Sequence, residues 1–135
     1  MTVVCGYVPT PQGRAALRAA LDEADRRGES LHVVNTSRGD ALVDPTFAGE
    51  GDLADIRAQL DESGVPFTLD QQVTGHDGAD GVLAAAREHE ASLVVIGLRR
   101  RSPTGKLLFG STAQKVLLEA DCMVLAVKAS PNNGG

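Results

Sequence analysis

Short apolar runs alternate along this chain with longer stretches in which apolar residues recur every three or four positions. The short runs are rich in β-branched residues, as buried strands are, and the spaced stretches are typical of helices with one face against a core. Helix-start and helix-stop residues lie between them, including Thr10 followed by Pro11, and Gly28. The pattern predicts strands at 1–8, 31–35, 66–73, 93–96 and 122–127, and helices at 11–27, 52–63, 77–89 and 112–120.

The regular alternation of strands and helices favours an α/β fold, in which a parallel sheet has helices on both faces. The strand at 66–73 begins with Pro66 and carries more polar residues than the others, so we expect it at an edge of the sheet. The pattern fits one domain over residues 1–129. Residues 130–135 have the composition of a disordered tail.

Three segments are expected to meet at the carboxyl ends of the predicted strands. In open parallel sheets, ligands bind beyond these ends, at the point where the strand order reverses. We expect that point between the first and fourth strands. The crevice there would be bordered by residues 7–10, which include Pro9 and Thr10, by Asn35 and Thr36, and by the loop after Gly97.

A basic loop connects the strand at 93–96 to the last helix. Glycines at both ends of the loop let the backbone approach a ligand, and the N-terminus of the following helix favours negative charge. The loop is therefore predicted to bind an anion, with an ordinary solvated charge run as the alternative. Its relevant residues are Gly97, Arg99, Arg100, Arg101, Lys106 and Gly110, followed by the hydroxyl-bearing Ser111 and Thr112.

Composition narrows the classes of partner. The 135-residue chain is 42% hydrophobic, enough to fold, but it has only 3% aromatic residues and a net charge of −5. A general nucleic-acid binder needs a basic footprint and stacking aromatics, so nucleic acid is not an expected partner. No apolar run approaches the roughly 20 residues of a membrane span, and no signal peptide is visible. We therefore expect a cytoplasmic protein without membrane contact, in which Cys5 and Cys122 stay free thiols.

Signals for catalysis and for metal binding are weak. His32, His76 and His89 lie far apart in the chain and are interpreted as structural or surface residues. Ser111 has no motif for activation by a base, so we interpret it as a phosphate-binding hydroxyl or a helix cap. The two cysteines lack the spacing of a metal site. No catalytic residue and no metal ligand is predicted.

From Gly97 onward the sequence resembles the universal stress protein family. The family's ATP-binding signature has a glycine, a second glycine three positions later, and, ten positions further on, a glycine followed by Ser or Thr. Gly97 and the pair Gly110 and Ser111 are in register with it, whereas Arg100 takes the place of the second glycine. Residues 113–127, AQKVLLEADCMVLAV, are also similar to the family's closing helix and strand. The resemblance implies a three-layer α/β sandwich with a five-stranded parallel sheet in the order 3-2-1-4-5.

The resemblance also implies a site for ATP or another adenine nucleotide, with or without magnesium. The backbone at Asn35 and Thr36 would contact the adenine. The aspartate that meets the ribose in ATP-binding members is replaced here by Val8, which cannot accept a hydrogen bond. The phosphates would lie against Arg99, Arg100, Lys106, Gly110 and Ser111.

The expected function is regulatory: an adenine-nucleotide-binding domain of the stress response, not a dedicated enzyme. Two alternatives stay open. One is a member that binds no ATP and acts through protein–protein contacts, with Val8 and Arg100 marking a lost site; the other is a weak ATP hydrolase. The resemblance further implies a homodimer through the strand from Cys122 to Val127, an apolar edge guarded only by Lys128.

Overall fold

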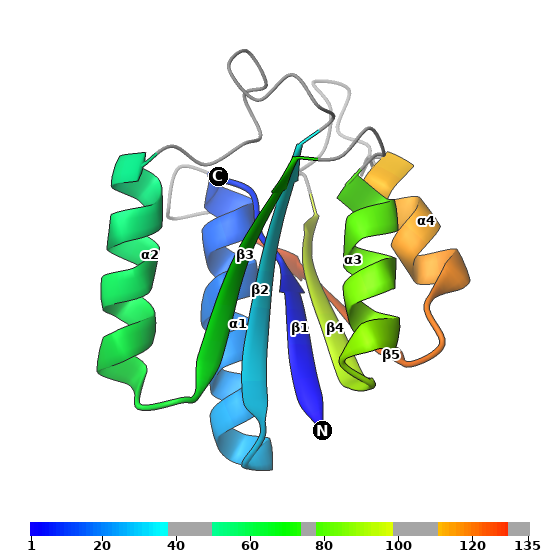
Figure 1. The fold of residues 1–135 in the computed structure, drawn as a ribbon. Coiled ribbons are helices and arrows are strands. Elements are labelled where there is room, and N and C mark those ends of the chain that lie inside the picture. Colours follow the sequence, from blue (N-terminus) through cyan, green and yellow to red (C-terminus); the bar gives the residue numbers. More distant parts are fainter. Residues whose placement is uncertain (38–49, 74–77, 99–110, 130–135) are drawn as a thin grey trace.

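The computed structural model describes residues 1–37, 50–73, 78–98 and 111–129 (Figure 1). Within these ranges, strands and helices alternate as the hydrophobic pattern predicts. The elements are β1 (Thr2–Gly6), α1 (Pro11–Arg27), β2 (Ser30–Ser37), α2 (Glu50–Ser63), β3 (Phe67–Val73), α3 (Gly78–Glu88), β4 (Ala91–Leu98), α4 (Ser111–Glu119) and β5 (Met123–Lys128).

The strands form one parallel sheet in the order β3-β2-β1-β4-β5, which confirms the predicted fold class and strand order. β1 and β4 occupy central positions because their apolar residues are buried on both faces of the sheet. β3 lies at an edge, as its polar composition predicts. β5 lies at the other edge and is the more apolar of the two.

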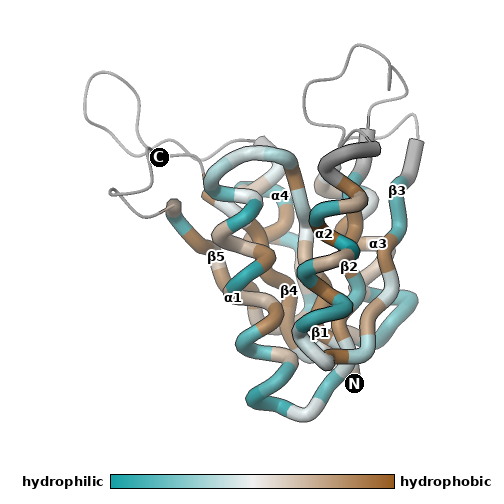
Figure 2. The backbone as a smooth tube through the Cα atoms, turned by 90° about the vertical axis from the view of Figure 1, so that its left-hand side faces the viewer, coloured by the Kyte–Doolittle hydropathy of each residue, from teal (hydrophilic) through white to brown (hydrophobic). Residues whose placement is uncertain are grey.

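Helices cover both faces of the sheet and enclose two separate hydrophobic cores. Helices α1 and α2 pack on one face, against side chains such as Cys5, Tyr7 and Val95. Helices α3 and α4 pack on the other, against Val4 and Val94. Figure 2 shows apolar residues along the strands, whereas polar and apolar residues alternate along α1 and α2. In the part of the chain that is described, no helix combines the length and apolar character needed to span a membrane.

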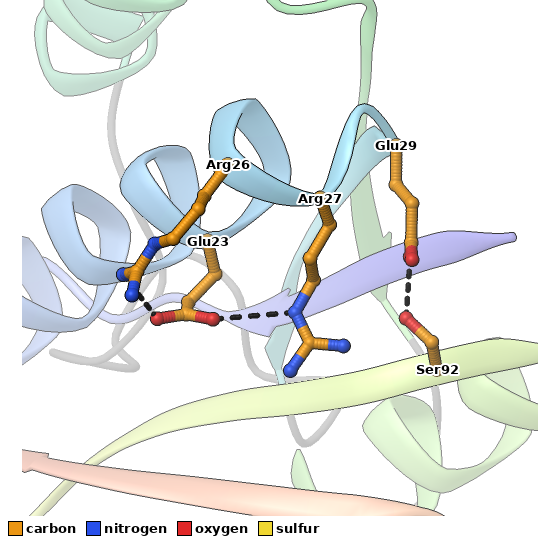
Figure 3. Close-up of polar contacts among 5 residues, drawn as sticks. All are labelled: Glu23, Arg26, Arg27, Glu29 and Ser92. Atoms are coloured by element: carbon orange, nitrogen blue, oxygen red, sulfur yellow. Dashed lines mark hydrogen bonds and ion pairs between the residues drawn. The ribbon is translucent and has the colours of Figure 1, made fainter.

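Local chemistry fixes both ends of α1. The Thr10 hydroxyl accepts a hydrogen bond from the Gly13 N–H (3.0 Å), and Pro11 is the first helical residue, as predicted. At the other end Gly28 adopts a left-handed conformation with φ of 68°. In the last turn Arg26 and Arg27 both pair with Glu23, at 2.6 and 3.2 Å (Figure 3).

Two expectations from the hydrophobic pattern are wrong in detail. The first strand ends at Gly6, short of Val8, because the chain turns there: the Thr10 N–H donates to the Val8 carbonyl (2.8 Å), and Pro9 has no N–H to offer a ladder. The apolar spacing within 112–120 also predicts that Ala113, Val116 and Leu117 face inward, but Leu117 is 40% exposed. Val116, one position earlier, occupies the buried stripe of α4, and successive helical residues point about 100° apart.

Candidate functional site

The central strand β1 is shorter at its carboxyl end than the strands on either side of it. Gly6 pairs with Val34 of β2 and with Ile96 of β4, and both neighbours continue, to Ser37 and to Leu98. The chain therefore leaves the sheet between two longer strands, at the point where the strand order reverses. The predicted convergence of three segments is thus confirmed for their described parts, which meet at the upper end of the sheet (Figure 1).

Asn35 holds the exit of β1 against β2. Its side chain is fully buried, and its Nδ2 donates to the Tyr7 carbonyl oxygen (2.8 Å). The Tyr7 N–H in turn donates to the Val34 carbonyl (2.9 Å). The Asn35 side chain is therefore engaged in positioning the crevice wall, which leaves its backbone as the candidate for ligand contact. Asn35 directly follows the buried Val33 and Val34, and a buried amide is expected to be hydrogen-bonded.

The backbone of Thr36 points toward the side of β2 on which β1 has ended. In a parallel strand, residues two apart direct their N–H and C=O groups to the same side. Val34 accepts from Tyr7 on the β1 side, so Thr36 faces that side too, beyond the last β1 residue. A donor and an acceptor in this position match the edge of a purine base, which itself carries donors and acceptors.

Pro9 and Thr10 line the exit of β1, but the Thr10 side chain is committed to capping α1. The Thr10 carbonyl accepts from the Arg14 N–H (2.9 Å), and Pro11 has no N–H. Most of the donors at the N-terminus of α1 are therefore satisfied internally or missing. The N-terminus of α1 thus has fewer free N–H groups for an anion than a helix N-terminus normally has.

Close packing against α1 explains why residue 97 is a glycine. A Cβ atom added there would lie 2.5 Å from the Gln12 carbonyl oxygen, so glycine lets β4 approach the first turn of α1. Gly13 is still tighter, since its added Cβ would lie 1.8 Å from the Val8 carbonyl oxygen. From the sequence alone, Gly97 is predicted to let the backbone approach a ligand. The structure shows that close packing against α1 accounts for it.

Of the remaining candidates, Ser111 and Thr112 form the N-terminus of α4, and Thr112 is half-buried. Helices α3 and α4 both start at the carboxyl end of the sheet, and Lys115 and Asp80 form an ion pair between them (2.6 Å). Two helix N-termini therefore direct partial positive charge to this end. The other predicted phosphate ligands, Arg99, Arg100, Arg101, Lys106 and Gly110, lie outside the described residues.

Thiol chemistry is disfavoured on the described residues. Burial raises the pKa of Cys5 to about 12, so its thiol stays protonated at neutral pH. Burial, with Asp121 adding to it, also raises the pKa of Cys122. Within the described ranges no group of three or more His, Cys, Asp or Glu side chains is placed to hold a metal ion.

Two features at the amino end of the sheet are not predicted from the sequence. His32 and His89, which are far apart in the chain, stack with their ring centroids 4.0 Å apart. A hollow of about 290 Å³ lies between α3 and α4 and is lined by Leu83, Arg87 and Cys122 among others. Local periodicity carries no signal for either feature, because each depends on which helix packs beside which strand. His76, the third histidine, lies outside the described residues.

Comparison with known proteins gives a consistent result over nearly the whole chain. Residues 1–128 match the Universal stress protein family. A universal stress protein of Mycolicibacterium smegmatis is 48% identical over 126 residues, which cover 93% of this chain and 96% of that protein. A universal stress protein structure from Archaeoglobus fulgidus superposes with a TM-score of 0.81 at 30% identity, covering 95% of this chain and 98% of the other. A second A. fulgidus structure, in complex with dAMP, gives a TM-score of 0.75 at 25% identity with the same coverage.

Proposed function

The chain belongs to the universal stress protein family, and we propose that it is a regulatory protein that binds an adenine nucleotide, ATP above all, at the carboxyl ends of β1, β2 and β4. The observation that carries the proposal is the early end of β1, which directs the Thr36 backbone toward the reversal point of the sheet. The A. fulgidus structure solved with dAMP supports the class of ligand.

In the proposed complex the backbone of Asn35 and Thr36 contacts the base. The phosphates lie over the N-terminus of α4, against Gly110, Ser111 and Thr112, with Arg99, Arg100 and Lys106 supplying charge. Arg100 stands where the signature has its second glycine. It gives up the close backbone approach that a glycine allows, and it supplies a side chain that can donate two hydrogen bonds to a phosphate. Magnesium is an optional companion of the phosphates.

Val8 gives the proposed site a distinctive specificity. It stands where ATP-binding members of the family carry the aspartate that meets the ribose, and its side chain accepts no hydrogen bond. The missing bond lowers affinity by about 1 to 3 kcal/mol, up to about a hundredfold. A site without a ribose acceptor does not distinguish ATP from dATP, so we expect equal affinities for the two.

Calorimetric titrations test this proposal. The wild-type protein is expected to bind ATP and dATP with the same affinity, with and without magnesium. Val8→Asp should tighten ATP binding and create a preference for ATP over dATP. Val8→Leu is the matched control and should leave both affinities unchanged. Absence of ATP binding by the wild-type protein and by a folded Val8→Asp variant alike would contradict the proposal.

We propose that the protein holds its nucleotide without turning it over. The half-buried Val8 and the capping Thr10, at the exit of β1, offer no general base. Prolonged incubation with ATP, followed by chromatographic detection of ADP, separates this proposal from a weak hydrolase. ADP formation that persists in the purified wild-type protein and disappears in Gly110→Val would favour the hydrolase.

A second candidate function, protein–protein interaction through a homodimer, is favoured by β5. Met123 is 59% and Leu125 is 36% exposed on this edge strand, whose unpaired backbone groups can accept a partner strand. We propose that two copies pair antiparallel along β5 about a twofold axis. We also propose that the protein works in the cytoplasm, where a free thiol such as Cys122 stays reduced.

Charges on α1 match such a twofold contact. Arg14 and Arg18 border a small hollow with Ala129, next to the end of β5, whereas Asp22 and Asp25 follow in the other half of the helix. All four are exposed, and none forms an ion pair among the described residues. A twofold axis across β5 makes the two α1 helices antiparallel and places the basic half of each opposite the acidic half of the other.

Light scattering on charge-swap variants tests this orientation. Replacing Arg14 and Arg18 by Glu should weaken the dimer, and further replacing Asp22 and Asp25 by Lys should restore it. Leu125→Pro, which removes a ladder donor, should give monomer or aggregate. A wild-type protein that stays monomeric at high micromolar concentration would refute the homodimer.

A further inference from the structure

The stacked histidine pair joins three elements at the amino end of the sheet. His32 lies on β2, on the same face as Val34 and therefore toward α3, and is only 6% exposed. Its Nδ1 forms a hydrogen bond with the hydroxyl of Thr68 on β3. Its ring stacks on that of His89, which directly follows α3, at an interplanar angle of 29°. The pair is thus a direct contact between the residue that follows α3 and the strands β2 and β3.

The end of α3 needs an external contact of this kind. Glu90 has a φ of 49°, a left-handed conformation that side chains other than glycine seldom adopt. At the end of α1 the same conformation is taken by Gly28, which has no Cβ to strain. The Glu90 N–H also makes only a long hydrogen bond to Arg87, at 3.3 Å. Strained residues persist where their surroundings hold them, and the His89 ring is the adjacent anchor.

The charged surroundings of His32 make this anchor sensitive to pH. Burial of the ring and the nearby His89 lower the pKa of His32, whereas Asp70 on β3 and Glu88 at the end of α3 act in the opposite direction with smaller effects. A lowered pKa means that the folded state favours the neutral ring. The stabilisation is therefore complete above the ordinary value of 6.5 and is lost as the pH falls through the folded-state pKa.

We propose that the stacked His32–His89 pair is an acid-sensitive latch, which holds the end of α3 against β2 at neutral pH and releases it when His32 takes up a proton. A protonated His32 ring would be buried away from water and stacked on a second imidazole, and both conditions disfavour the charge. The latch is independent of the proposed nucleotide site, which lies at the other end of the sheet (Figure 1).

Opening of the latch would also change the hollow between α3 and α4. The last turn of α3, with Ala86 and Arg87, and the adjacent Glu90 form one wall of the 290 Å³ hollow, and Cys122 lies on the opposite wall. Release of that turn widens the hollow and uncovers the Cys122 thiol. Acidification would in this way enlarge an existing hollow without unfolding the sheet.

The latch is tested by NMR on the full chain between pH 7.5 and 5.0. The His32 ring is expected to titrate below the value of an unperturbed histidine, and this midpoint should rise in His89→Gln, which removes the neighbouring charge. Exchange protection of the Glu90 amide, corrected for intrinsic rates, should fall from pH 7.0 to 5.5, by up to about eightfold, the limit for one proton-linked group with an ordinary pKa of 6.5.

In His89→Gln the Glu90 amide should be weakly protected at both pH values, because the stack is missing throughout. His89 is only partly buried, so this variant is expected to fold, and the wild-type titration stands even if it does not. Unchanged protection across the pH range in the wild type would overturn the latch. So would an equal pH-dependent loss in His89→Gln, or a His32 midpoint at or above 6.5.

Discussion

The two ends of the sheet are built on different principles. At the carboxyl end β1 stops early, glycines bring α1 within steric contact of the neighbouring backbone, and one buried amide secures the exit of β1. At the amino end side chains cross-link the elements: the Ser92 hydroxyl of β4 donates to Glu29 (Figure 3), and His32 stacks on His89. At the carboxyl end β2 and β4 extend past β1, and at the amino end side chains hold separate elements together. The comparison shows that close backbone packing holds one end of this scaffold together, whereas side-chain contacts hold the other.

The largest effect is expected from Gly13→Ala at the carboxyl end. The new methyl group would overlap the Val8 carbonyl oxygen, which is backbone and cannot swing aside. We expect a loss of roughly 4 kcal/mol or more in the free energy of unfolding, measured by urea denaturation. Gly97→Ala meets the Gln12 carbonyl less closely and should lose less. A Gly13→Ala protein of wild-type stability would contradict the packing described for this end.

Asn35→Asp should come next. The substitution keeps the shape but replaces the donor to the Tyr7 carbonyl with a buried carboxylate, so we expect a loss of about 2 to 3 kcal/mol at pH 7. Because a protonated carboxyl group can donate again, the difference from the wild type should shrink as the pH falls. A pH-independent difference in parallel urea titrations would mean that the amide does not act through its donor.

The smallest effect belongs to the amino end. An added Cβ at Gly28 meets nothing within 4 Å, but φ there is 68°. Gly28→Ala should therefore lose only about 1 kcal/mol, through backbone conformation alone. Gly28→Asn should recover part of this loss, since asparagine tolerates the left-handed region. Equal thermal shifts for the Ala and Asn variants would show that the conformational explanation is wrong.

The sequence predicted what local patterns encode. Periodicity placed every described strand and helix to within a few residues, and the Thr10–Pro11 cap follows from residue type alone. The contacts between distant segments were not predictable. The stacking of His32 on His89, the backbone contact that requires Gly97, and the early end of β1 depend on which elements pack together. Periodicity indicates which face of a helix is buried, but not which element packs against that face.

The candidate site was predictable in part for the same reason. Asn35 and Thr36 were placed at the crevice from topology, and the structure brings their strand end beside the exit of β1. The sequence did not show that the Asn35 side chain donates to the Tyr7 carbonyl oxygen, because that contact joins two strands. The contact leaves only the backbone of Asn35 as a candidate for ligand binding.

Backbone amide NMR during an ATP titration is the decisive test of the proposal that an adenine nucleotide binds at the carboxyl end of the sheet. We expect saturable shifts of the amide signals of Thr36, Leu98 and Thr112, with the signals of Glu90 and Cys122 at the amino end unchanged. Saturable shifts confined to the hollow beside Cys122, or no shift at any residue at millimolar ATP, would contradict it.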